Sequence, residues 1–270
     1  MEKTPSRLTR RGRLVLTLVT VLALTAAAVV VALLARGTKE EPGALVVPEG
    51  RRAAKVYETV DRALGEDPGT TRKAVAGAEL ALPPEAKGNP EGYLFPATYP
   101  VKSSTTPAGL LAYMVDTANE RFGAEGVTSG AKRNGLTVYQ AVTVASIVQA
   151  EADTRADMGK VARVIRNRTA KGMPLQMDST LNYALNRSTL DTTHGDTRLD
   201  SPYNTYERQG LPPTPIGNPG DQAMDATLAP TPGDWLYFVT VAAGDTRFTA
   251  DYAEHQKNVE EFNRNRKNGS

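Results

Sequence analysis

The segment from residue 201 to 220, SPYNTYERQGLPPTPIGNPG, constrains the fold of this chain more than any other. It contains five prolines and three glycines within twenty positions. Proline fixes φ and glycine permits positive φ, so together they set the path of a loop rather than loosen it. The segment also carries Tyr203, Asn204 and Tyr206, which a disordered linker would rarely combine. These features predict a shaped loop that forms the wall of a binding site; the alternative is a purely structural connector.

The residue types present exclude several kinds of chemistry. Cysteine is absent, which excludes disulfides, a thiol nucleophile and a Cys-based metal site. The two histidines, His194 and His255, are too few for a His-rich zinc site, and a Ser-His-Asp triad would have to use one of them. No GxSxG, HExxH, Walker A or GxGxxG pattern occurs. We therefore expect the chemistry to rest mainly on carboxylates, amides, hydroxyls and the backbone.

An apolar segment near the N-terminus predicts a membrane anchor. Residues 14–35 form 22 uncharged and mostly apolar positions, which is long enough to cross a bilayer as a helix. The alternative is a cleavable signal peptide, because Ala26–Ala28 could mimic a cleavage site. Basic residues precede the segment, and the positive-inside rule then places the N-terminus in the cytoplasm and the rest of the chain outside. They are Lys3, Arg7, Arg10, Arg11 and Arg13.

The net charge of +2 comes from this basic tail. Residues 1–13 hold five of the 32 basic residues and one of the 30 acidic residues, so the rest of the chain carries a net charge of −2. A near-neutral extracytoplasmic part suits a neutral or mixed-charge substrate, and it argues against a nucleic-acid partner.

Hydrophobic periodicity predicts an α+β fold in which helices dominate. The expected parts are a cytoplasmic basic tail (1–13), the transmembrane helix (14–35), a stalk with a short membrane-proximal module (36–90), a larger catalytic domain (91–262) and a frayed polar tail (263–270). The pattern predicts helices at 51–64, 70–81, 106–122, 137–151, 157–171, 219–229 and 251–266, and strands at 44–47, 234–241 and 246–249.

Glu151 is the best candidate for a catalytic acid. It ends the predicted helix 137–151, TVYQAVTVASIVQAE, where the turn of about 100° per residue places it over Ile147 and Val148. A carboxylate beside an apolar stripe loses hydration, which raises its pKa and favours the neutral form. That form can protonate a leaving-group oxygen. The alternative is a helix-end glutamate that reaches solvent or pairs with Arg155.

Five further residues are candidates for substrate binding. Gln176 and Asp178 fall in a segment expected to be extended, which would point both side chains to one side; the alternative is hydrogen bonding within a turn. Tyr203, Asn204 and Tyr206 supply flat rings and an amide that could grip a sugar, or they could pack under the proline-rich loop.

Several segments together resemble the endolytic murein transglycosylase family (the MltG or YceG-like family). No single segment would be specific, but their order along the chain is. They are EGYLFPATY at 91–99, ASIVQAE at 145–151, KGMPLQMDST at 171–180, SPYNTY at 201–206, GLPPTPIGNPG at 210–220, LYFV at 236–239 and DYAEH at 251–255.

The resemblance implies a single-pass enzyme of the cell membrane that cuts MurNAc–GlcNAc bonds within nascent peptidoglycan strands. It would leave 1,6-anhydroMurNAc ends and terminate strand elongation, with cell-wall synthases as possible partners. The family's catalytic glutamate lies in the motif matched by 145–151. Position 149 is Gln where many members have Glu, so the role falls to Glu151. The family's LysM-like subdomain corresponds to an abbreviated module at 44–90.

A single carboxylate suits this reaction. Most glycosidases need two carboxylates, whereas a lytic transglycosylase can use the C6 hydroxyl of its substrate as an internal nucleophile, already held in place. Glu151 would act first as acid and then as base, and the reaction that the resemblance implies needs no metal or organic cofactor. Two alternatives remain: a muramidase that uses water, with Asp178 as base, and a non-enzymatic, membrane-tethered glycan-binding scaffold.

Overall fold

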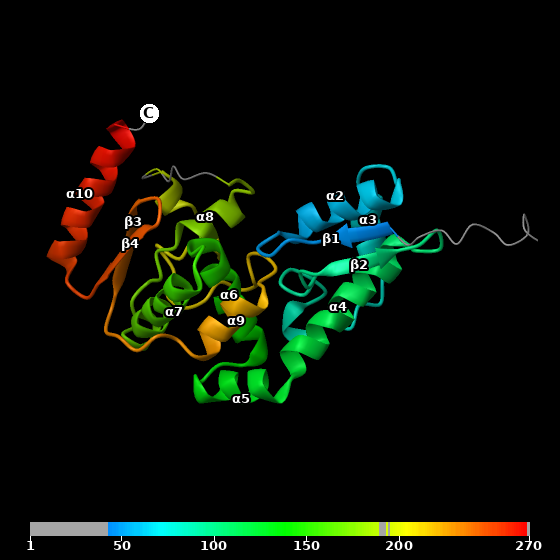
Figure 1. The fold of residues 1–270 in the computed structure, drawn as a ribbon, viewed down its shortest axis with the longest axis horizontal. Coiled ribbons are helices and arrows are strands. Elements are labelled where there is room, and N and C mark those ends of the chain that lie inside the picture. The colour runs from blue at the N-terminus through cyan, green and yellow to red at the C-terminus, as the bar shows by residue number, and fades with distance from the viewer. Residues whose placement is uncertain (1–42, 189–192, 194, 269–270) are drawn as a thin grey trace, which may run out of the picture. The chain divides into compact units, whose positions relative to one another are not determined.

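The structure is a computed structural model that describes residues 43–188, 193 and 195–268. Residues 44–270 form one compact unit (Figure 1). The predicted cytoplasmic tail (1–13) and transmembrane helix (14–35) lie outside the described residues. Within the described ranges, no helix combines the length and the apolar character needed to cross a membrane.

The first described elements build a small layer of helices beside a two-stranded sheet. Strand β1 (Gly43–Val46) pairs with β2 (Thr98–Val101), while α2 (Ala53–Leu64), α3 (Thr70–Val75) and α4 (Pro107–Gly123) pack on one another. Helix α2 buries Val56 and Val60 and ends at Gly65, which adopts the left-handed conformation. Helix α3 is shorter than the predicted 70–81.

The pairing of β1 with β2 crosses the predicted boundary between residues 90 and 91. The backbone N–H of Val47 donates to the Ala97 carbonyl at 2.9 Å, and a turn of 3₁₀-helix (Pro84–Ala86) joins the two sides. Residues 44–90 are thus part of the same compact unit as the rest of the described chain.

Helix α6 (Val138–Glu151) is the central element of the larger part. It contacts α5 (Glu125–Arg133), α7 (Arg155–Ala170), α8 (Asp178–Ala184) and α9 (Asp221–Leu228), and Figure 1 shows it among α7, α8 and α9. A capping box between Thr137 and Gln140 starts the helix. Residues 141–148 are all buried, and full burial of each larger aliphatic side chain contributes about 1.5–3 kcal/mol. This burial holds the C-terminal end of α6 in place.

The C-terminal part is a hairpin covered by a helix. Strand β3 (Tyr237–Ala242) pairs antiparallel with β4 (Asp245–Thr249), Phe238 lies opposite Phe248, and α10 (Tyr252–Asn268) packs on both strands. A second 3₁₀ turn covers Asp196–Arg198. The predicted α+β class in which helices dominate is confirmed, and the sheets of the described residues have two strands each.

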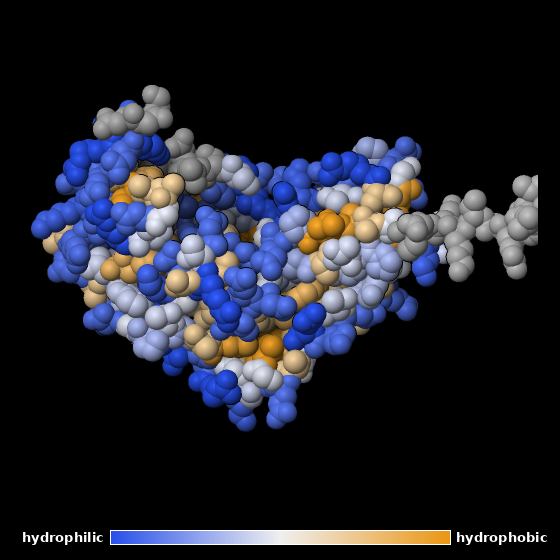
Figure 2. Space-filling model, in the orientation of Figure 1, coloured by the Kyte–Doolittle hydropathy of each residue, from blue (hydrophilic) through white to orange (hydrophobic). Residues whose placement is uncertain are grey.

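On the face in Figure 2, the surface is mostly hydrophilic and hydrophobic residues occupy small separate areas. The large hydrophobic side chains that are exposed within the described part of the chain are Val46, Tyr113 and Tyr252. Within the described part of the chain, most large apolar side chains therefore lie in the core.

Candidate active site

Glu151 lies at the C-terminal end of α6, in the wall of a cleft of about 460 Å³. Its side chain is partly buried, and its Oε1 accepts a hydrogen bond of 3.3 Å from the backbone N–H of Ser179. Arg155 lies 3.5 Å from Asp225 instead of pairing with Glu151. The cleft is lined by Gly50, Arg52, Ala150, Glu151, Asp178, Ser179, Asn182, Ser188 and Ile216.

The surroundings of Glu151 favour its protonated form. Burial raises the pKa of the carboxyl, and the nearby charge of Asp178 raises it further, while contacts with Ser179 oppose the shift. The net direction is upward. Glu151 can therefore hold a proton at a pH where an exposed glutamate has lost it, as a general acid requires.

Asp178 lies beside Glu151 in the cleft, but not in an extended segment. The prediction of extended structure was wrong here, because Asp178 is the first residue of α8. Its Oδ1 accepts a 2.6 Å hydrogen bond from the Tyr206 hydroxyl. Burial and this carboxylate raise the pKa of Tyr206 far above its usual value, so the phenol remains a donor. Tyr206 therefore fixes the second carboxylate of the cleft.

The Ser179 hydroxyl is a candidate that the sequence did not indicate. Its Oγ is buried and has no hydrogen-bond partner of good geometry within the described part of the chain. It belongs to the cleft wall, next to the carboxylate that its own N–H contacts. Because this Oγ has no accessible surface, the hydroxyl acts on the neighbouring Glu151 carboxyl, whose pKa it lowers, and not on a ligand.

Gln176 lies outside the cleft wall. It has a positive φ of 53° and an exposed side chain, whose carbonyl oxygen accepts a 3.0 Å hydrogen bond from Arg168. Because Asp178 is helical and Gln176 has a left-handed backbone, the two side chains do not share one side as predicted.

Asn204 and Tyr203 stabilise the proline-rich loop from inside. The Asn204 side chain is fully buried; its amide nitrogen donates to the carbonyls of Thr197 (3.0 Å) and Leu199 (2.8 Å). Tyr203 is partly buried, and its hydroxyl lies 2.8 Å from that of Thr214. A fully buried side chain does not reach a ligand, so the position of Asn204 does not support direct contact with a sugar.

The loop 201–220 is nevertheless part of the site. Its Ile216 lines the cleft, and the Ile216 N–H donates to the buried Ser146 hydroxyl of α6 at 3.0 Å. Asn218 also ties the loop down: its Oδ1 accepts from Leu94 N–H (2.8 Å) and its Nδ2 donates to the Arg51 carbonyl (2.7 Å). The loop is therefore a fixed wall facing the end of α6.

Glu91 is a buried carboxyl that the sequence pattern did not indicate. It is 4% exposed and accepts hydrogen bonds from Ala53 N–H (2.9 Å) and the Tyr183 hydroxyl (3.1 Å). Burial raises its pKa to about 7 despite these donors and the nearby Arg52 charge. The signal available in the sequence is a charged residue at the start of the mainly apolar segment 91–99.

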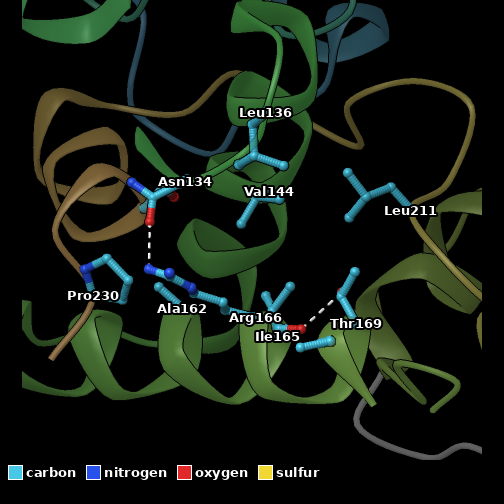
Figure 3. Close-up of a pocket in the computed structure, with 11 residues that line it drawn as sticks. Asn134, Leu136, Val144, Ala162, Ile165, Arg166, Thr169, Leu211 and Pro230 are labelled. Atoms are coloured by element: carbon cyan, nitrogen blue, oxygen red, sulfur yellow. Dashed lines mark hydrogen bonds between the residues drawn. The ribbon is translucent and has the colours of Figure 1, made fainter. Parts of the chain in front are cut away.

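A second pocket, of about 240 Å³, lies against another part of α6 (Figure 3). Its lining is mainly apolar, with Leu136, Val144 and Ile165, and Arg166 donates to Asn134 Oδ1 at 2.7 Å. It has no carboxylate in its lining, so the acid–base chemistry points to the cleft at Glu151. No group of three or more His, Asp or Glu residues in the described ranges is arranged to hold a metal ion.

The fold and the cleft define a helix-rich α+β protein with one desolvated carboxyl at the end of a buried helix. The model of the YceG-like family matches residues 22–261, and the chain belongs to that family. A crystal structure of a yceG-like protein from Listeria monocytogenes matches with a TM-score of 0.69 and 31% identity, over 80% of this chain and 75% of that one.

Two curated relatives carry the name endolytic murein transglycosylase. The protein from Bacillus subtilis (strain 168) is 39% identical over 64% of this chain and 48% of its own length. The protein from Streptococcus pneumoniae serotype 2 (strain D39 / NCTC 7466) is 32% identical over 84% of this chain and 47% of its own length. The chain thus spans about half the length of these relatives.

Proposed function

We propose that this protein is an endolytic peptidoglycan lytic transglycosylase. The observation that carries the proposal is the carboxyl of Glu151, whose pKa is raised by burial and which faces a cleft. The names of the relatives support it. The substrate would be a glycan strand of nascent peptidoglycan, cut at the MurNAc–GlcNAc bond so that elongation of the strand ends.

The reaction needs only one carboxyl that changes its protonation state. Protonated Glu151 donates to the glycosidic oxygen as the bond from that oxygen to C1 of MurNAc breaks. The C6 hydroxyl of the same sugar then attacks C1 and gives its proton to the Glu151 carboxylate. The products are a free GlcNAc hydroxyl and a 1,6-anhydroMurNAc end, and no water is consumed. Because the nucleophile belongs to the same sugar, its effective concentration at C1 is high.

The other cleft residues would hold the substrate and tune the acid. Asp178 favours the protonated form of Glu151 through its charge, and Tyr206 holds Asp178. Ser179 would hold the Glu151 carboxyl in place through its backbone N–H. The effect on the substrate would be indirect for Tyr203, Asn204 and Gln176, through the loop and the turn that these residues stabilise.

We also propose that residues 14–35 anchor the protein in the cell membrane, with residues 1–13 in the cytoplasm and the compact unit outside. The apolar length and the preceding basic residues support this arrangement. Residues 44–90 would be the counterpart of a LysM-like module. In this position the cleft would act on strands close to the membrane, where synthases produce them.

A muramidase is the second candidate, because Asp178 lies in the same cleft and could serve as base for a water molecule. In that reaction the new MurNAc end would be reducing and one water heavier. A glycan-binding scaffold would produce neither end.

The test compares Glu151→Gln with wild-type protein in release of fragments from purified peptidoglycan. We expect loss of release by about a thousand-fold or more, since a general acid and base is removed from both steps. Glu207→Gln is the matched control, because Glu207 is an exposed carboxylate of the loop 201–220. Unchanged release by Glu151→Gln, with its fold intact, would refute the enzyme assignment.

A further inference from the structure

Glu91 and Tyr183 are joined by a buried hydrogen bond that the proposed reaction does not use. The Tyr183 hydroxyl donates to Glu91 Oε2 at 3.1 Å, and Glu91 Oε1 accepts from the Ala53 N–H at 2.9 Å. Glu91 is 4% exposed, and neither Glu91 nor Tyr183 belongs to the lining of the cleft at Glu151. Any effect of this carboxyl on the reaction must therefore pass through the elements that it joins.

The two ends of this link lie on elements that form the cleft wall. Ala53 is the first residue of α2 and follows Arg52, which lines the cleft, while Tyr183 lies in α8. The Arg52 side chain makes a second connection between the same two elements. Its Cζ lies 5.3 Å from the centre of the Tyr183 ring, and its Nη1 donates to the Asn182 carbonyl at 3.2 Å. One buried carboxyl thus holds the start of α2 and the C-terminal half of α8 together.

Helix α8 also carries the residues that lie beside the acid. Tyr183 lies one turn after Ser179, whose N–H donates to Glu151 Oε1 at 3.3 Å. The contacts of Ser179 lower the pKa of Glu151, whereas burial and the charge of Asp178, the first residue of α8, raise it. With seven residues, α8 depends on its tertiary contacts for its position. A shift of α8 would therefore change both the donor and the charge next to the acid.

We infer that Glu91 is a positioning residue: through the Tyr183 hydroxyl it fixes α8, and through α8 it places Ser179 and Asp178 beside Glu151. The inference rests on the proposed function, in which Glu151 is the acid and the base. A misplacement of about 1 Å caused far from the chemistry can lower a rate by about a hundred-fold. Because Glu91 and Tyr183 lie outside the cleft lining, loss of the link should lower kcat without a matching rise in KM.

The test measures the formation of anhydro ends by the full chain in detergent, on uncross-linked glycan strands that carry their peptides. Tyr183→Phe keeps the ring beside Arg52 and removes only the hydroxyl. We expect it to lower kcat by about ten-fold and to leave KM within about two-fold. Tyr99→Phe is the matched control, because it removes another buried hydroxyl, which donates to the Phe95 carbonyl at 2.6 Å. It should leave kcat within about two-fold of the wild type.

Two substitutions of Glu91 separate position from charge. Glu91→Asp keeps the charge but shortens the side chain by one methylene, so it cannot reach both the Ala53 N–H and the Tyr183 hydroxyl. It should lower kcat by about ten-fold, and adding Tyr183→Phe to it should cause little further loss. Glu91→Gln removes the charge but keeps the length, and its amide nitrogen can donate to the Tyr183 hydroxyl in place of the original bond. It should keep kcat within about three-fold.

Hydrogen exchange of residues 178–184, followed by mass spectrometry on the full chain, gives a readout that does not depend on catalysis. Exchange should become about five-fold faster with Tyr183→Phe and with Glu91→Asp, and should stay unchanged with Glu91→Gln and Tyr99→Phe. Absence of anhydro ends in the wild-type reaction would refute the proposed function. The exchange rates would then decide separately whether Glu91 holds α8.

A wild-type kcat in Tyr183→Phe, an equal loss in Tyr99→Phe, or a rise in KM without a loss of kcat would each overturn the inference. A greater loss with Glu91→Gln than with Glu91→Asp would overturn it as well, because the effect would then belong to the charge. Thermal unfolding shows which variants retain the fold. If Tyr183→Phe is unfolded, the comparison of Glu91→Asp with Glu91→Gln decides.

Discussion

Replacing Glu91 by Gln should change how the stability of this protein depends on pH. The Glu91 carboxyl is 4% exposed and has a pKa of about 7, against an ordinary value of 4.5. Its two main donors, Ala53 N–H and the Tyr183 hydroxyl, and the nearby Arg52 charge do not offset the loss of hydration. Ionised Glu91 is therefore a cost to the folded state.

The size of this cost follows from the pKa difference. Each pKa unit corresponds to about 1.4 kcal/mol, so a rise to about 7 amounts to about 3 kcal/mol. Because the folded pKa is raised, the favourable contribution of Glu91 is complete below its unfolded pKa. It is lost as pH rises through about 7. Glutamine resembles the protonated acid in shape, so Glu91→Gln should lack this decline.

Urea unfolding of residues 36–270 at pH 5 and pH 8 measures the effect. The free energy of unfolding of Glu91→Gln, relative to wild type, should rise by up to about 3 kcal/mol from pH 5 to pH 8. The control is Glu85→Gln, which removes an exposed carboxylate. A relative change below about 1 kcal/mol, or one of opposite sign, would show that the donors keep Glu91 ionised and would refute the reasoning.

Two further substitutions test the contact of Gly92 with the loop 201–220 and the effect of Asp178 on the pKa of Glu151. Gly92→Ala should destabilise the protein by about 1–3 kcal/mol more than Gly210→Ala in urea unfolding. Both glycines have positive φ (87° and 84°), so the backbone cost of alanine is similar at the two positions. A Cβ at Gly92 would lie 2.5 Å from a proline ring of the loop 201–220, whereas one at Gly210 would meet nothing within 4 Å. Equal losses of unfolding free energy for the two variants would contradict this contact. The charge of Asp178 helps to raise the pKa of Glu151, and the protonated form of Glu151 is lost as pH rises through that pKa. Asp178→Asn should therefore lower this pKa, so that activity begins to decline at a lower pH than in the wild type. The control is Asp153→Asn, at an exposed position, which should leave the pH–rate profile unchanged. An unchanged profile with Asp178→Asn would count against electrostatic coupling between Asp178 and Glu151.

Local sequence patterns were enough to predict most helices and the C-terminal hairpin. The apolar run of α6, for instance, begins at the capping box of Thr137 and ends at Glu151, where the predicted helix ends. Patterns within one segment do not report partners far away in the chain. Strand β2 was missed because its pairing with β1 joins residues about fifty positions apart.

In the candidate site, too, residues with a local signal were predicted and residues that depend on distant contacts were missed. Glu151 was found because its helix supplies the apolar surroundings locally. Asp178 was placed in the site, but its backbone was mispredicted, since α8 begins where turn and strand signals compete. Arg52 and Glu91 were missed because their importance depends on contacts with Tyr183, which lies far from both in the sequence. Asn204 was predicted to bind the substrate, but both the nitrogen and the oxygen of its side-chain amide form hydrogen bonds to the nearby backbone.

The central claim is that Glu151 breaks a glycosidic bond through an internal nucleophile. It is tested most directly by mass analysis of peptidoglycan fragments released by residues 36–270, with Glu151→Gln analysed in parallel. We expect MurNAc ends that are one water lighter than reducing ends in the wild-type digest, and no such ends with the variant. Reducing ends in the wild-type digest, or anhydro ends with Glu151→Gln, would contradict it.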